Sequence, residues 1–118
     1  MSILAGIRWG WVVLGAILGE AVLFGVAVLL YVLPGGPDLL SYVIPPVSLV
    51  AMAGAGFWVA RRAGHHRVLN GTLVGVIAAL AYVGLTWGKA LPVAYVISHG
   101  LKVVGGIVGG VLAQRRGA

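Results

Sequence analysis

The chain has 118 residues, of which 61% are hydrophobic and only 8% are charged, and its mean hydropathy is +1.11. Soluble globular domains carry about 25% charged residues, so this composition predicts an integral membrane protein. The sequence has no cysteine, which excludes disulfides, thiol nucleophiles and cysteine-ligated metal sites. The net charge of +6 is explained by membrane topology and lipid headgroups, and we expect no nucleic-acid partner.

Four apolar stretches predict four transmembrane helices. Each is close to the roughly 20 residues that cross a hydrocarbon core of about 30 Å. They cover approximately residues 10–33, 39–60, 69–87 and 91–113. Because the connections are short, consecutive helices are expected to be antiparallel neighbours. The predicted fold is an all-α bundle of four transmembrane helices that forms a single domain over residues 1–118.

The first stretch follows Arg8 in the way that the apolar region of a signal peptide follows its basic residues. It is longer than such a region, contains Glu20, and ends at the turn residues 34–38 rather than at a small-residue cleavage site. We therefore expect it to be retained as a helix.

The basic residues predict the orientation. All six arginines fall on one face of the four-span arrangement, and they are Arg8, Arg61, Arg62, Arg67, Arg115 and Arg116. The opposite loops carry only Asp38 and Lys89. The positive-inside rule therefore places both termini in the cytoplasm, with the arginines against anionic lipid headgroups. Trp9, Trp11, Trp58 and Trp87 lie near the ends of the spans, where aromatic anchors are expected.

Two adjacent histidines, His65 and His66, lie in the central loop among these arginines. Adjacent histidines rarely chelate one metal together, and this face offers no cysteine or acidic ligand to complete a site. We interpret them as part of the basic patch. No metal or other cofactor is expected.

Glycines at four-residue spacing predict how the helices pack. Small residues let membrane helices approach closely, and such pairs occur at Gly15 and Gly19 in the first helix and at Gly71 and Gly75 in the third. The last helix carries a double stripe, made of Gly105, Gly106, Gly109 and Gly110, that is wide enough for two neighbours. The alternative use of these stripes is a homodimer seam.

The same glycines indicate an internal repeat. The spacing in the first helix resembles that in the third, and glycines before Arg61 and Arg62 resemble those before Arg115 and Arg116. This pattern favours two tandem helical hairpins in the same orientation, although any two glycine-rich membrane hairpins look alike. Within the second helix, Pro45 and Pro46 must interrupt the regular hydrogen bonding, and the freed carbonyls either contact neighbours or line a cavity.

Two charges lie inside the apolar stretches, and charges there are expensive. At a rise of about 1.5 Å per residue, Glu20 lies about 15 Å from the cytoplasmic edge and Lys102 about 16 Å from it. His99 is one turn from Lys102 on the same helical face, and Tyr82 and Ser48 lie at a similar depth. We therefore predict a buried polar cluster with Glu20 and Lys102 at its centre.

Three interpretations of this cluster remain open. The first is a structural ion pair that fixes how the first and fourth helices dock. The second is a proton- or ion-responsive site, because ionisable groups inside a membrane are functional candidates by default. The third is that the two groups do not meet and each has a partner in another subunit.

Residues 53–85, together with Leu101-Lys102-Val103-Val104-Gly105-Gly106-Ile107-Val108-Gly109-Gly110, carry a wider resemblance. They resemble an uncharacterised family of small bacterial four-helix membrane proteins. The resemblance implies a multi-pass protein of the bacterial inner membrane and brings no activity with it. Locally, Gly15-Ala16-Ile17-Leu18-Gly19-Glu20 resembles the first helix of small multidrug resistance transporters, whose membrane glutamate exchanges protons for cationic drugs. The later helices lack the aromatic pattern of that family, and Lys102 offers Glu20 a partner.

Enzymatic activity is not expected. The sequence has no phosphate-binding loop, no paired carboxylates and no nucleophile placed beside a base. The function that the sequence favours is a non-catalytic packing, accessory or oligomerising membrane subunit, in a homodimer or a larger membrane complex. The alternative is a small proton-coupled transporter or channel that uses Glu20 as its proton or ion site.

Overall fold

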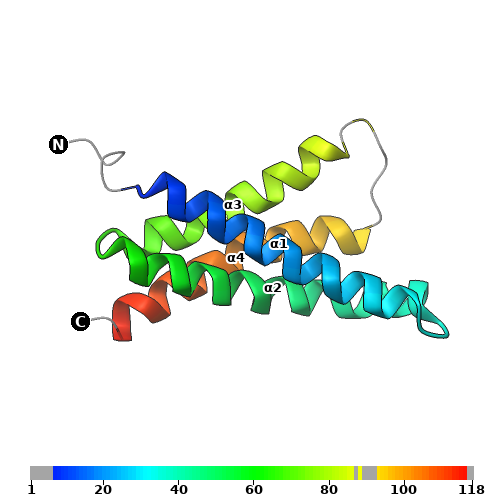
Figure 1. Ribbon diagram of the computed structural model, residues 1–118. Helices are drawn as coiled ribbons and strands as arrows, with labels where there is room; N and C mark the ends of the chain where they lie inside the picture. Colours follow the sequence, from blue (N-terminus) through cyan, green and yellow to red (C-terminus); the bar gives the residue numbers. More distant parts are fainter. Residues whose placement is uncertain (1–6, 87, 89–92, 117–118) are drawn as a thin grey trace.

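The computed structural model describes residues 7–86, 88 and 93–116. These residues form four helices, α1 (Trp9–Tyr31), α2 (Gly36–Ala63), α3 (Arg67–Leu85) and α4 (Val93–Arg116) (Figure 1). The prediction of an all-α protein with four long helices is confirmed. The predicted end of the third helix at Trp87 and the predicted start of the fourth at Leu91 lie outside the described residues.

All four helices are long and apolar enough to cross a membrane. Their outward faces carry large apolar side chains, such as Ile17, Phe24 and Leu80, which are 59%, 72% and 63% exposed. A helix that is apolar on its outer face as well as its inner face is suited to lipid rather than to water. The four described helices are thus compatible with a multi-pass helical membrane protein.

Glycines form the turns on either side of α2. Gly35 precedes α2 with φ of 73°, and Gly64 ends it with φ of 81°. Only glycine adopts this left-handed backbone conformation without a steric penalty, so these two residues fix where the chain reverses. Pro45 and Pro46 lie inside α2, which continues through them as one helix. The loss of two backbone donors there interrupts the hydrogen bonding without ending the helix.

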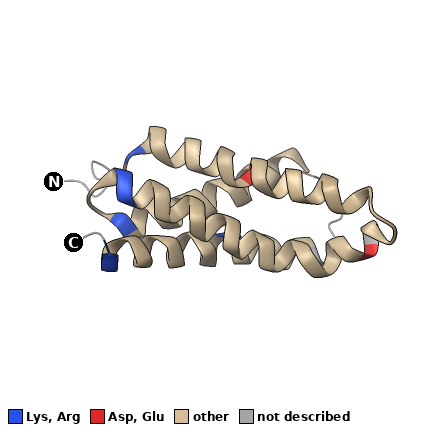
Figure 2. Ribbon diagram, turned by 60° about the horizontal axis from the view of Figure 1, so that its bottom comes forward, with Lys and Arg blue, Asp and Glu red and all other residues tan. Residues whose placement is uncertain are grey.

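The helices pack with α4 against both α2 and α3, and with α1 against the same two helices. Among the described residues, α1 and α4 are the one helix pair without an extensive close approach. The start of α1 and the end of α4 lie at the same end of the bundle, called the terminal end below (Figure 1). Basic residues gather at that end, and an acidic residue, Asp38 in the first turn of α2, marks the other (Figure 2).

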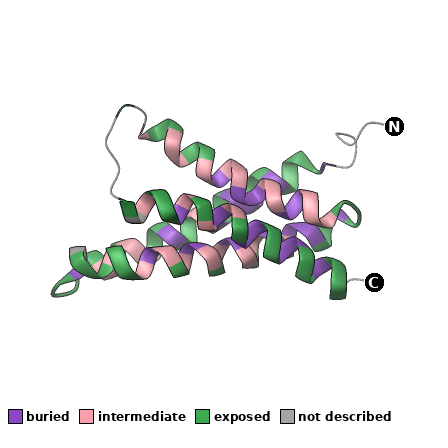
Figure 3. Ribbon diagram, turned by 180° about the vertical axis from the view of Figure 1, so that it is seen from behind, coloured by how far each residue is buried: buried purple, intermediate pink, exposed green. Residues whose placement is uncertain are grey.

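The bundle is closely packed in one half and splayed in the other. Buried positions in α1 end at Leu23 and those in α3 end at Ala78, although both helices continue for about two further turns. Figure 3 shows most of the buried ribbon in the half nearer the termini. Met52, Val59 and Val74, all fully buried, form the centre of this packed half.

Candidate functional site

The glycines of α4 lie against two neighbouring helices. A Cβ added to Gly105 would lie 2.5 Å from the carbonyl oxygen of Leu49, and one added to Gly109 would lie 2.6 Å from the amide nitrogen of Phe57, both in α2. Gly106 and Gly110 meet the backbone of α3 in the same way. The four glycines are buried, so the double stripe faces the inside of the bundle and holds α4 between α2 and α3.

The glycines of α3 complete this contact and set the position of Lys102. Gly71 faces Gly106 and Gly110, with an added Cβ 2.7 Å from the carbonyl oxygen of Gly106. One turn further along, a Cβ on Gly75 would meet the backbone carbonyl of Lys102 and lie 2.9 Å from the Cα of Val103. The backbone at Lys102 is therefore pressed directly onto α3.

The glycines of α1 place Glu20. Gly15 faces Val59 of α2, and a Cβ added to Gly19 would lie 2.6 Å from the terminal methyl group of Met52. A Cβ added to Gly105 of α4 would lie 3.1 Å from the Cβ of the same methionine. Met52 therefore separates α1 from α4, which explains why long side chains are needed to connect them.

Glu20 and Lys102 make that connection. The Lys102 ammonium nitrogen lies 2.6 Å from Oε1 of Glu20, and the two side chains are 4% and 29% exposed respectively. The carboxylate oxygen in this contact is buried. At such a distance in a water-poor interior the two charges stabilise one another strongly. The interpretation in which the two groups do not meet does not hold in this structure.

Aromatic rings from α3 and α4 surround the lysine. The Lys102 nitrogen lies 5.0 Å from the ring centroid of Tyr82, which suits a cation–π contact. The Tyr82 ring is 4.8 Å from that of His99 and 6.5 Å from that of Tyr95. Both ring nitrogens of His99 are buried and have no hydrogen-bond partner in the described part of the chain.

Ser48 of α2 is fully buried, and its hydroxyl has no hydrogen-bond partner among the residues described. The ion pair and the ring contacts join four of the five predicted cluster residues, namely Glu20, Lys102, Tyr82 and His99. The place of Ser48 in this cluster, expected from its depth along the second helix, stays a prediction.

The arginines at the terminal end differ in their surroundings. The Arg62 guanidinium lies over two rings, 5.3 Å from that of Trp11 and 5.4 Å from that of Trp58, and these two rings make an edge-to-face contact. Arg61 lies 5.7 Å from the ring of Phe57.

The remaining arginines sit at other helix ends. Arg67 donates to the carbonyl of Ala113 at 3.4 Å, which joins the start of α3 to the end of α4. Arg8 precedes α1, and both Arg115 and Arg116 are exposed in the last turn of α4. His65 and His66 lie exposed in the short connection between α2 and α3, beside this group of arginines.

Asn70 is a structural residue that the sequence analysis did not single out. It is fully buried in the first turn of α3 and accepts a hydrogen bond of 2.8 Å from the backbone amide of Arg8. Its amide group donates to the carbonyl of His66 at 2.9 Å and to that of His65 at 3.3 Å. One side chain thus joins the start of α1 to the connection between α2 and α3. A lone amide inside an apolar stretch was the available signal.

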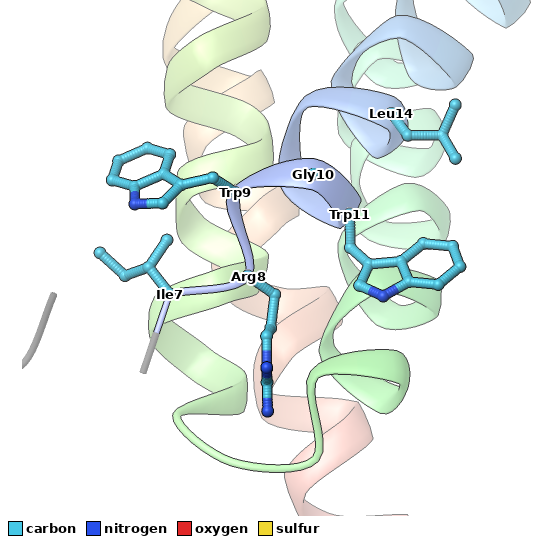
Figure 4. A pocket seen from close by; sticks show the side chains of 6 residues that line it. All are labelled: Ile7, Arg8, Trp9, Gly10, Trp11 and Leu14. Carbon is cyan, nitrogen blue, oxygen red and sulfur yellow. The ribbon is translucent and has the colours of Figure 1, made fainter. Parts of the chain in front are cut away.

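Two pockets lie at the terminal end. The larger, of about 560 Å³, is lined by residues of α1 and the segment before it, and Figure 4 shows the six of them. The smaller, of about 350 Å³, is lined by Phe57, Trp58, Arg61 and Arg62 of α2. Neither pocket includes Glu20 or Lys102, so neither leads to the ion pair.

Fold and site together define a class, a four-helix protein of the multi-pass membrane type with a buried ion pair between non-adjacent helices. Comparison with protein-family models, curated protein sequences and solved structures gives no match. The resemblances described from the sequence therefore stay predictions.

Proposed function

We propose that this chain is a non-catalytic protein of the bacterial inner membrane, a packing or accessory subunit in which the Glu20–Lys102 ion pair docks α1 relative to α4. The observation that carries this proposal is the 2.6 Å contact between two helices that Met52 otherwise holds apart. Removing one member of a buried ion pair is strongly unfavourable. The pair therefore selects one arrangement of the helices over others of similar apolar packing.

The proposed orientation places the arginine-rich end and both termini in the cytoplasm, against anionic headgroups. Two tandem hairpins, α1–α2 and α3–α4, build the bundle. The splayed half exposes the apolar side chains of Phe24, Leu29 and Leu85. As a subunit, the chain would use this half to meet a second copy or another membrane protein.

A second candidate function is a proton- or ion-responsive site. It is favoured by the 29% exposure of Glu20 and by the two unpartnered nitrogens of His99. Both residues lie where the packed half of the bundle meets the splayed half. Intramembrane acids in such positions are typical of proton pathways.

A flux assay in proteoliposomes separates the two candidates. An imposed pH gradient is applied to vesicles that contain the wild type or Glu20→Gln, and the internal pH is followed with a trapped dye. The docking proposal predicts that the pH gradient decays in both kinds of vesicle at the rate seen in vesicles without protein. A wild-type flux that disappears in a correctly folded Glu20→Gln variant would establish the second candidate and overturn the first.

A further inference from the structure

The arginine-rich end has no acidic side chain to neutralise it. The chain has only two acidic residues. Glu20 is paired with Lys102 near the middle of the bundle, and Asp38 lies in the first turn of α2 at the opposite end. The arginines at this end therefore have no side-chain counter-ion, and anions from outside the chain can pair with them.

The larger pocket is built to receive such a counter-ion. It is lined by Ile7, Arg8, Trp9, Gly10, Trp11 and Leu14. In Figure 4 the indoles of Trp9 and Trp11 project to opposite sides, and the Arg8 side chain extends between them toward the connection between α2 and α3. A planar guanidinium suits phosphate because it donates two parallel hydrogen bonds. Indole rings favour the boundary between headgroups and acyl chains.

A glycine provides the space between the rings. A Cβ added to Gly10 would meet nothing within 4 Å, so the floor of the pocket is open where any other residue would place a side chain. Leu14 also lines the pocket and lies about one turn further along α1 than Gly10. It is at the end of the pocket away from the Arg8 guanidinium (Figure 4). The pocket is therefore polar at its outer end and apolar at its inner end, as a phospholipid is.

Arg62 adds a second positive charge beside the pocket. Its guanidinium lies 5.3 Å from the ring of Trp11, which lines the pocket, and 5.4 Å from the ring of Trp58. Contact with two aromatic faces holds this charge in place without a carboxylate.

We propose that the pocket at the start of α1 binds one anionic phospholipid, with the Arg8 guanidinium on the phosphate, Arg62 beside it and an acyl chain along Trp11 and Leu14. The inference deepens the headgroup contact proposed above and replaces a diffuse attraction with a defined site. Basic pockets at the cytoplasmic ends of membrane helices recognise headgroups in this way.

Native mass spectrometry of the full chain in detergent tests the site, with phosphatidylglycerol and phosphatidylcholine of identical acyl chains as probes. We expect phosphatidylglycerol to be retained preferentially and Arg8→Gln to weaken its binding about fivefold. Gly10→Leu should abolish the preference by filling the pocket. Two matched controls, Arg115→Gln at the same end and Gly25→Leu at another open glycine of α1, should stay within about twofold of the wild type.

Three results would overturn the proposal. Equal binding of the two lipids would show that the phosphate charge is not recognised, and an equal loss with Arg115→Gln would show diffuse attraction. Displacement of the lipid by millimolar inorganic phosphate would identify free phosphate as the ligand. Binding in detergent involves neither orientation nor proton flux, so a failure here is distinguishable from a failure of the proposed function.

Discussion

Single polar side chains decide how this apolar bundle is held together. Lipid provides no hydrophobic force to drive helices together, so specific contacts between them carry the arrangement. Glu20 and Lys102 connect α1 to α4 at the middle of the bundle. Asn70 connects the start of α1 to the loop before α3 at one end of it. The ion pair does so between two helices that are not in extensive close contact, and Asn70 does so between two chain segments at one end of α1.

Asn70→Ala tests this role at the end of the bundle. The change leaves the amide of Arg8 without its acceptor and removes the side-chain donor from the carbonyls of His65 and His66, although His66 keeps its bond from the backbone amide of residue 70. A polar group that loses its partner in the protein costs up to about 1–3 kcal/mol, so we expect the free energy of unfolding in micelles to fall by about that amount. Thr72→Ala is the control, because the Thr72 hydroxyl donates to Val68 within its own helix. Equal losses in the two variants would contradict the role of Asn70.

At the scale of the helix, the glycines matter because they allow close backbone contact between helices, not because they make the chain flexible. Those that face a neighbouring backbone, such as Gly75 and Gly109, leave no room for a methyl group. Others in the same helices, such as Gly84 and Gly100, would meet nothing within 4 Å. The glycine content therefore divides into buried contact positions and open positions, and only the former set the helix spacing.

A pair of substitutions in α3 checks this division. Gly75→Ala forces α3 away from the backbone of Lys102, and overpacking of this kind costs about 1–3 kcal/mol. Gly84→Ala adds the same methyl group in open space and should leave stability unchanged or raise it by up to about 1 kcal/mol, the helix-propensity difference. Thermal unfolding followed by circular dichroism in one detergent compares them. If both variants unfold like the wild type, the close contact of α3 with α4 is not needed.

For the whole molecule, the sequence predicts the features that depend on depth and hydropathy. Counting residues predicts that Glu20 and Lys102 lie at one level, because the rise per residue of a helix is constant. Counting does not give the lateral order of the helices. The separation of α1 from α4 by Met52 and the splayed half both depend on which faces pack. The sequence does not give these faces, because the side chains that face lipid and those that face protein are both apolar.

The orientation of the molecule is open to a direct test, because the chain contains no cysteine. His65→Cys lies in the exposed connection between α2 and α3, and Pro34→Cys lies in the exposed turn between α1 and α2. If the arginine-rich end is cytoplasmic, a membrane-impermeant maleimide applied to intact cells should label the second variant and not the first. Labelling of His65→Cys alone would reverse the proposed orientation.

The central claim, that Glu20 and Lys102 form a docking ion pair, is tested most directly by a double-mutant cycle. Glu20→Gln leaves Lys102, the more deeply buried partner, without an opposite charge. It should therefore lower the free energy of unfolding by about 3–5 kcal/mol. Lys102→Met leaves the partly exposed Glu20 carboxylate without an opposite charge and should lower the free energy of unfolding by less. The double variant should recover much of this loss, with a coupling of about 2 kcal/mol. Strictly additive losses would show that the pair does not dock the helices.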